Sequence, residues 1–265
     1  LFKDKGSHIL MYHSIGAETG ESRKDIYRME ESLFRSHMKH IKELTNRKVL
    51  PLADWAKNSD ALIITFDDGF ADVLTAATIL SSLNFPFTVF VSPALVQSDD
   101  SRYLNTEGLV ELSKVANCTI GSHGYSHVPL VELDNAKLKQ ELKDSKDWLE
   151  SLLTIPINVM SYPHGSVDRR VRDAVRVAGY KIAACSRPGG NSKDADSLNL
   201  HRTDIWSLDD EAIFIYKKTI RNEPFINFIK GISLNKINFK KNKICFNKFT
   251  KLITNYIKYM NVKTS

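Results

Sequence analysis

The chain has 265 residues, which is long enough to bury a sizeable core and to form one large domain. Hydrophobic residues make up 42% of it, charged residues make up 26%, and no run of 18 apolar residues occurs. The composition therefore predicts a globular protein without a membrane span. The net charge of +6 resides in residues 222–265, which hold nine of the 37 basic and one of the 31 acidic residues, leaving −2 for the rest. We expect no nucleic-acid partner, because such a protein would gather basic residues around its site.

Apolar segments and helical patterns alternate along the chain, which predicts a parallel sheet with crossover helices. The expected strands span residues 9–13, 62–65, 87–91, 118–121, 157–162, 181–185 and 198–205. The expected helices span residues 32–44, 71–83, 105–115 (with Asn105 as the N-cap), 133–153, 167–178 and 209–220. The helix over 133–153 has leucines at helical spacing, and we expect it to face the core and to carry no chemistry.

The composition changes after Pro224 to Lys, Asn, Ile and Phe, so we expect a barrel domain over 1–221 and a basic extension over 222–265. The apolar residues of the extension recur at helical spacing. Packing against the barrel, or a mobile extension, is the favoured interpretation, and peripheral contact with an anionic membrane surface is the alternative.

Three widely spaced cysteines, Cys118, Cys185 and Cys245, are odd in number and predict no disulfide framework. They fit a reducing compartment. Residues 1–5 lack the apolar core of a signal peptide, so we expect a cytoplasmic protein.

Two short polar motifs follow predicted buried strands. Asp67 and Asp68 end the apolar run 62–65, and His123 and His127 follow the strand 118–121. Consecutive strand residues point to opposite faces, so the two aspartates cannot do the same job. Either motif alone would be an ordinary turn or a surface pair, but both stand at strand ends, where the loops of a parallel barrel converge. One carboxylate and two imidazoles leave open coordination positions, which is the pattern of a catalytic metal site.

These motifs, TFDDG at 65–69 and SHGYSH at 122–127, resemble the first two motifs of the polysaccharide deacetylase family (NodB homology, carbohydrate esterase 4). SYPHG at 161–165 is similar to the third motif of the family. LMYHSI at 10–15 resembles the opening of its circularly permuted branch, which contains poly-N-acetylglucosamine deacetylases. The resemblance covers about residues 8–206 and implies an α/β fold, a distorted (β/α)7 barrel of the NodB-homology type.

The resemblance implies a role for each motif residue. Asp68, His123 and His127 hold a divalent metal, and Asp67 is the general base. The metal polarises the carbonyl and lowers the pKa of its water. Zinc is the first expectation, and cobalt, nickel, iron and manganese also suit these ligands.

The same resemblance makes His13 the first candidate for the general acid, with His201 and His164 as the remaining candidates. A backbone N–H of the turn formed by Pro163, His164 and Gly165 is expected to meet the oxyanion. Tyr162 either shapes the pocket or is an ordinary core residue.

One position departs from the pattern of the family. Better-known members begin the third motif with an arginine that holds the catalytic aspartate in its ionised form, and this chain has Ser161 there. Arg202 or Arg187 could tune Asp67 instead, although Arg202 could equally form an ion pair of purely structural importance.

The expected function is metal-dependent removal of N-acetyl groups from a sugar within a glycan or glycan precursor. A deformylase or amidase on a small, non-polymeric substrate is the alternative within hydrolysis. A catalytically silent glycan-binding barrel, suggested by Ser161, is the alternative outside catalysis.

Overall fold

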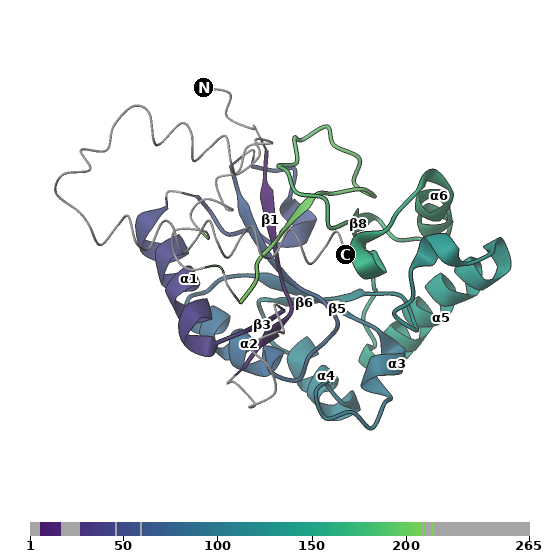
Figure 1. The fold of residues 1–265 in the computed structure, drawn as a ribbon, viewed down its shortest axis with the longest axis horizontal. Helices are drawn as coiled ribbons and strands as arrows, with labels where there is room; N and C mark the ends of the chain where they lie inside the picture. Colours follow the sequence, from purple (N-terminus) through teal and green to yellow (C-terminus); the bar gives the residue numbers. More distant parts are fainter. Residues whose placement is uncertain are drawn as a thin grey trace, which may run out of the picture. The chain divides into compact units, whose positions relative to one another are not determined.

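The computed structural model describes residues 6–16, 27–45, 47–58, 60–207, 209 and 214. Within them the main sheet has seven strands, all parallel, in the order β8-β7-β6-β5-β4-β1-β9 (Figure 1). These are β1 (His8–Tyr12), β4 (Leu62–Phe66), β5 (Phe87–Val91), β6 (Cys118–Ser122), β7 (Val159–Ser161), β8 (Ile182–Ala184) and β9 (Arg202–Asp204). The helices are α1 (Glu31–Leu44), α2 (Val73–Ser82), α3 (Pro93–Val96), α4 (Thr106–Ser113), α5 (Asn135–Leu153) and α6 (Arg169–Val177).

The two edges of this sheet meet through the segment that leads into β9. Leu200 forms a parallel bridge with Ala184 at the end of β8. Its carbonyl accepts a hydrogen bond from Cys185 N at 2.8 Å, and its N–H donates to the carbonyl of Ala183 at 3.0 Å. The sheet is therefore a nearly closed barrel of seven parallel strands, and the predicted NodB-type (β/α)7 fold is confirmed.

Alternating side chains of the strands supply two apolar layers. Ile9, Ile63, Phe90 and Val159 belong to a smaller buried cluster, and their sequence neighbours belong to a larger one. The larger cluster includes the buried faces of α1, α2, α4, α5 and α6, so it lies between the sheet and the helices around it (Figure 1). Alternate strand residues such as Ile9 and Ile63 therefore face the interior of the barrel.

The strand β1 is inserted between β4 and β9. It is paired residue by residue with β4, from His8 opposite Leu62 to Tyr12 opposite Phe66, and Asp67 N donates to the carbonyl of Tyr12 at 3.0 Å. The residue after β1, His13, therefore emerges beside the residues that follow β4.

Most predicted elements are present, with ends shifted by a few residues. Asn105 caps α4 as expected, because its side chain accepts a hydrogen bond from Gly108 N. The strand predicted over 198–205 is shorter, Arg202–Asp204, because residues 198–201 belong to the closing segment. Two short paired strands, β2 (Ser14–Ile15) and β3 (Arg28–Met29), and the short helix α3 were not predicted.

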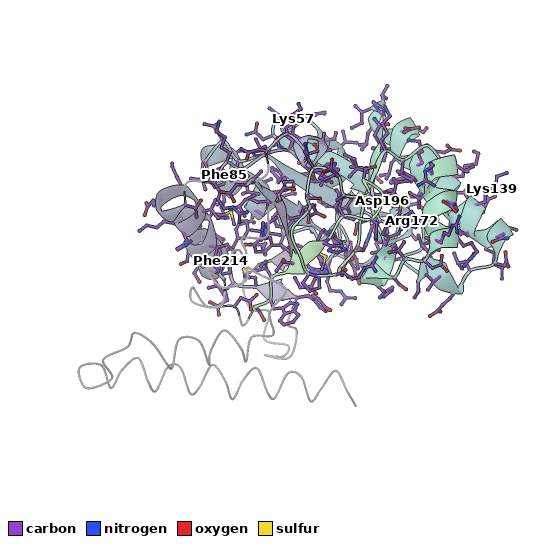
Figure 2. All side chains as sticks on the ribbon, turned by 90° about the horizontal axis from the view of Figure 1, so that it is seen from above. Lys57, Phe85, Lys139, Arg172, Asp196 and Phe214 are labelled. Carbon is purple, nitrogen blue, oxygen red and sulfur yellow. The ribbon has the colours of Figure 1, made fainter. Side chains whose placement is uncertain are left out.

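An ion pair joins the connection between β8 and β9 to the helix α6. Arg172 of α6 lies beside Asp196 of this connection, with 3.4 Å between Nε and Oδ2 (Figure 2).

The helix predicted over 209–220, apart from Asp209 and Phe214, and the basic extension over 222–265 lie outside the described residues. No helix in the described part is long and apolar enough to span a bilayer. Cys118 and Cys185 are free thiols, and Cys245 lies outside the described residues.

The glycine in β6 is required by the crowded interior of the barrel. A Cβ atom at Gly121 would lie 2.6 Å from Phe90 Cδ1 and 2.9 Å from Val159 Cγ2. We therefore expect Gly121→Ala to lower the free energy of unfolding by about 1–3 kcal/mol, because overpacking forces the ring and the strand apart. Urea unfolding measures this change. Val177→Ala is the control, since Val177 is 82% exposed, and it should change stability by less than about 0.5 kcal/mol. Equal unfolding midpoints for the two variants would contradict the prediction.

Candidate active site

The predicted motif residues converge at the C-terminal end of the barrel strands. His13 follows β1, Asp67 and Asp68 follow β4, and His123 follows β6. Parallel strands all end at the same edge of a barrel, so side chains that are far apart in the chain meet there. The turn after β7, Pro163–Gly165, lies at this edge as well.

Asp68, His123 and His127 form one group whose ligand atoms all lie within 4.8 Å of one another. Asp68 Oδ1 is 3.3 Å from Nε2 of His123 and 3.0 Å from Nε2 of His127. His123 Nδ1 lies 2.9 Å from the carbonyl oxygen of Ser161, so it donates there and Nε2 is left to face Asp68. The structure thus brings together the three predicted ligands.

The backbone is bent to bring these ligands together. Asp68 and His127 both have positive φ, 71° and 57°, and Gly69 continues the turn at 73°. Side chains other than those of Gly, Asn and Asp rarely adopt this region, because Cβ crowds the carbonyl oxygen. The turn breaks the strand alternation and directs Asp68 to the two histidines, while Asp67 continues β4 and faces the barrel interior.

Asp67 is held by a buried bidentate ion pair. Arg202 donates from Nη1 to Oδ1 and from Nη2 to Oδ2 of Asp67, both at 2.7 Å. Ser161 Oγ adds a third hydrogen bond to Oδ2 at 3.1 Å and itself accepts one from Arg202 Nη2 at 2.6 Å. Arg202 is fully buried, with its Nε bonded to the carbonyl of Cys185 and its guanidinium over the ring of Phe90. This closed network fixes both carboxylate oxygens.

The charges of the site favour ionised carboxylates and a positive centre. Burial alone would raise the pKa of Asp67, but the guanidinium of Arg202 and the ring of His123 hold it below its ordinary value. Asp68 behaves alike, since burial is outweighed by hydrogen bonds from His123 and His127 that lower its pKa. Burial would lower the pKa of His123, yet the carboxylates of Asp67 and Asp68 raise it. The two carboxylates therefore favour a positive charge between them, which a bound cation would supply.

Arg202 resolves the question that Ser161 raised in the sequence. It forms an ion pair with Asp67, which it reaches from β9 through the barrel interior. Arg187, the other predicted partner, instead donates to Asn199 Oδ1 at 2.6 Å. Ser161 does not leave Asp67 without support, because its hydroxyl is part of the same network.

His13, which follows β1, lies near enough to the two aspartates to act on their charges. It is among the groups whose charge lowers the pKa of both Asp67 and Asp68. Its Nδ1 is buried and finds no hydrogen-bond partner among the described residues, and its ring lies 4.4 Å from that of Tyr27. The next residue, Ser14, donates to Asp72 Oδ2, which fixes the backbone beside His13.

The turn after β7, Pro163–Gly165, lies beside the ligand residue His127. His164 has φ of 57°, its Nε2 lies 3.2 Å from the carbonyl oxygen of His127, and the two rings are 4.7 Å apart. A Cβ atom at Gly165 would lie 2.3 Å from Ser186 Oγ, so only glycine fits there. His164 is therefore beside the ligand group but is already bonded to its backbone.

Two predicted site residues lie away from this group. Tyr162 is fully buried in the layer between sheet and helices and donates to the carbonyl of Leu198 at 2.6 Å, because strand alternation turns it away from Ser161. His201 precedes β9 and is bonded through Asn191 to Ser7, at the N-terminal ends of the strands. Burial and the charge of Arg187 lower the pKa of His201. His201 is thus at the opposite end of the barrel from His13.

The sequence analysis missed two residues on α5, Glu141 and Ser145. Glu141 accepts hydrogen bonds from the N–H and the hydroxyl of Ser126, and Ser145 donates to the carbonyl of Gly124 at 3.0 Å. A signal for Ser145 was present, because a serine occupies one position of the otherwise leucine-lined face of this helix. The helix predicted to carry no chemistry therefore contacts the segment between His123 and His127.

Removing the guanidinium should destabilise the fold in a pH-dependent way. We expect Arg202→Met to lower the free energy of unfolding by about 3–5 kcal/mol at pH 7, because Asp67 is left as a buried, unpaired charge. The folded-state pKa of Asp67 is depressed, so the stability that the pair contributes is present above about pH 4, the unfolded value, and is lost as the pH falls through the folded value. The difference between wild type and variant should therefore shrink on acidification.

Urea unfolding at pH 7 and at successively lower pH measures this. Arg35→Met is the matched control, since Arg35 pairs with Glu31 on the exposed surface of α1 and should contribute less than about 1 kcal/mol. A deficit for Arg202→Met that stays constant with pH would contradict the assignment of the effect to Asp67.

Comparison with known proteins gives one consistent picture. Residues 55–183 match the family model described as polysaccharide deacetylase. The chain is 26% identical over 205 residues to a protein of Bacillus subtilis (strain 168) named "Putative polysaccharide deacetylase YxkH", covering 74% of this chain and 70% of that one.

Solved structures agree. BC0361, a polysaccharide deacetylase from Bacillus cereus, is 25% identical with a TM-score of 0.71, covering 81% of this chain and 69% of that one. The Streptococcus pyogenes deacetylase PplD, solved in complex with acetate, shares the fold at 21% identity and a TM-score of 0.73, covering 82% of this chain and 99% of that one. With the barrel and motif residues described above, these matches show that the chain is similar in sequence and fold to the polysaccharide deacetylase family.

Proposed function

We propose that the protein is a divalent-metal-dependent hydrolase that removes N-acetyl groups from a glycan or a glycan precursor. The observation that carries this proposal is the pairing of two differently held aspartates. Asp68 lies against two imidazoles. Asp67 is instead bound by Arg202 and kept ionised, and its Oδ2 lies 3.7 Å from His123 Nε2. One carboxylate is thus available as a ligand and the other as a base.

The donor set suits a divalent metal. Asp68, His123 and His127 would hold it, since their ligand atoms already converge and the carboxylates favour a positive charge between the rings. Zinc fits one carboxylate and two imidazoles best, and cobalt, nickel, iron or manganese fit them to differing degrees. When bound, the metal would polarise the acetyl carbonyl and make water a better nucleophile.

Asp67 is proposed to take the proton of the attacking water. A base has to be ionised before it can accept a proton, and Arg202 ensures this by lowering the pKa of Asp67. The same guanidinium makes the carboxylate of Asp67 a weaker base. Asp67 therefore contributes through its fixed orientation and not through high basicity. Ser161 supports that orientation from a second side.

The turn after β7 is proposed to stabilise the oxyanion. Gly165 N–H donates to the carbonyl of Tyr162 at 2.8 Å and Ser166 N–H to that of Pro163 at 3.4 Å. His164 N–H is therefore the backbone donor that we assign to the developing negative charge. His13, which follows β1, is proposed to protonate the departing amine.

The substrate class, an N-acetylated sugar or polysaccharide, rests on the similarity to polysaccharide deacetylases. The alternative of a catalytically silent glycan-binding barrel was suggested by Ser161, which replaces an arginine. Arg202 supplies the ion pair for Asp67, so this reason for the alternative no longer holds. Hydrolysis of a small amide uses the same residues and is the second arm of the test below. Membership of the permuted branch, cytoplasmic location and membrane contact through residues 222–265 stay predictions from the sequence.

Acetate release tests the function directly. Metal-stripped protein and protein reloaded with zinc or cobalt would be incubated with N-acetylglucosamine oligomers, with nucleotide- and lipid-linked N-acetyl sugars, and with small formyl and acetyl amides. Acetate released from the sugars only after reloading is the expected result. Metal binding without release from any sugar would overturn the deacetylase proposal, and cleavage of small amides alone would favour the amidase.

Substitutions should separate the two aspartates. Asp68→Ala and His123→Ala are expected to lose metal and activity together, because each removes a ligand. Asp67→Asn should keep the metal and lower kcat by about 10²–10⁴-fold, because the amide keeps the shape but accepts no proton. Metal content by elemental analysis and turnover by acetate release measure the two properties. Full activity of Asp67→Asn would show that another group is the base.

The general acid can be tested with a pair of histidines. We expect His13→Gln to lower kcat by about 10²–10⁴-fold, since the amine then leaves without a proton donor. His201→Gln is the control and should keep the wild-type rate, because His201 lies at the other end of the barrel. Acetate release and metal content are measured for both. Full activity of His13→Gln would transfer the role to His164.

A further inference from the structure

The loop that carries both imidazoles is strained. We call residues 123–127 the ligand loop. Its ligand His127 has φ of 57°, and Gly124 within it has φ of 69°. A histidine keeps a left-handed backbone only where the surrounding contacts leave it no alternative. The contacts of the ligand loop therefore decide where His127 stands.

Two buried serines fix the start of the ligand loop. Gly124 N–H donates to Ser122 Oγ at 3.2 Å, and Ser145 Oγ donates to the carbonyl of Gly124 at 3.0 Å. The two hydroxyls are 2.7 Å apart. Since Ser145 uses its one proton on Gly124, Ser122 is the donor between them. Both polar backbone groups of Gly124 are thus satisfied by side chains.

The end of the ligand loop is fixed by Glu141. Its Oε1 accepts from Ser126 N–H at 2.5 Å, and its Oε2 accepts from Ser126 Oγ at 3.0 Å. Both bonds are made to a carboxylate, which makes them stronger than bonds between neutral groups. Ser126 directly precedes His127, so these bonds set the direction in which the chain enters the ligand residue.

Glu141 and Ser145 are one helical turn apart on α5, and so they present their side chains on the same face of the helix. That helix is anchored by its buried leucines Leu138, Leu142 and Leu149. Glu141 is not itself one of the clustered ligands among the described residues. Its two oxygens are turned to the loop, which makes it a support and not a ligand.

We propose that Glu141 is a positioning residue that sets the metal affinity and the coordination geometry of the site through Ser126 and His127. The inference rests on the proposed function, because it presupposes that the three ligands hold a metal. Without the carboxylate, the entry to His127 has no fixed partner on the α5 side, and the strained backbone can relax. His127 then leaves the position from which its Nε2 faces Asp68.

Cobalt titration tests the proposal without relying on activity. Metal-free wild type, Glu141→Ala, Glu141→Gln and Gln140→Ala would be titrated with Co²⁺ in competition with a chromophoric chelator, and the visible absorption of bound Co²⁺ would report its coordination. Gln140 is the matched control, because it neighbours Glu141 on α5 but bonds to Asp144. Circular dichroism and thermal unfolding of the metal-free proteins would show that the fold is kept.

We expect Glu141→Ala to bind Co²⁺ about 10–100-fold more weakly and with an altered spectrum. Glu141→Gln should lie between it and wild type, and Gln140→Ala should equal wild type. If Glu141→Ala fails to fold, Ser126→Ala removes one of the two bonds from the exposed side, and its affinity should fall several-fold.

Wild-type affinity and spectrum in Glu141→Ala, or in Ser126→Ala where that variant is needed, would overturn this inference and leave the proposed function standing. A wild-type protein that binds no Co²⁺ at all would overturn the metal site and this inference together.

Discussion

The buried pair of Asp67 and Arg202 connects the fold of this protein to its chemistry. Two ions enclosed in a barrel are costly to desolvate, and the cost is offset only because each side-chain oxygen of Asp67 and each side-chain nitrogen of Arg202 has a partner. Removing either ion leaves the other stranded. The pair is therefore weak as a source of net stability but strong as a constraint, because it admits a single arrangement of β4, β7 and β9 around one carboxylate.

Around that constraint the site separates the work of neighbouring residues. Asp67 continues its strand into the barrel interior, while the left-handed turn at Asp68 directs the next carboxylate to the imidazoles. Strand geometry alone would place the two on opposite faces. Because of the turn, both carboxylates lie close to the same ring, with Asp67 Oδ2 at 3.7 Å and Asp68 Oδ1 at 3.3 Å from His123 Nε2. A single change of backbone conformation thus gives two identical side chains different environments.

The sequence was sufficient for the barrel and for the group of Asp68, His123 and His127, because apolar runs mark buried strands and the motifs stand at their ends. Tyr162 could have been assigned to the outer layer by alternation from Ser161. The choice between Arg202 and Arg187 could not be made, since it depends on the register of β9 against β1 and on the reach of a long side chain through the interior. The two-residue strands β2 and β3 give too short a pattern to detect. Glu141 lies beyond reach as well, because helical periodicity indicates a face but not which loop that face will meet.

The insertion of β1 between β4 and β9 also bears on the order of assembly. Pairing β1 with β4 closes a loop of about fifty residues, but pairing it with β9 joins Ile9 to Arg202, near the two ends of the barrel domain. Contacts of such long sequence separation require a large loss of chain entropy before they stabilise the fold, so they tend to form late. Arg202 reaches Asp67 only through this last pairing. A nascent or truncated chain that lacks β9 would therefore hold Asp68, His123 and His127 on formed strands while Asp67 remains without its counter-ion, and the same step that closes the barrel would complete the group.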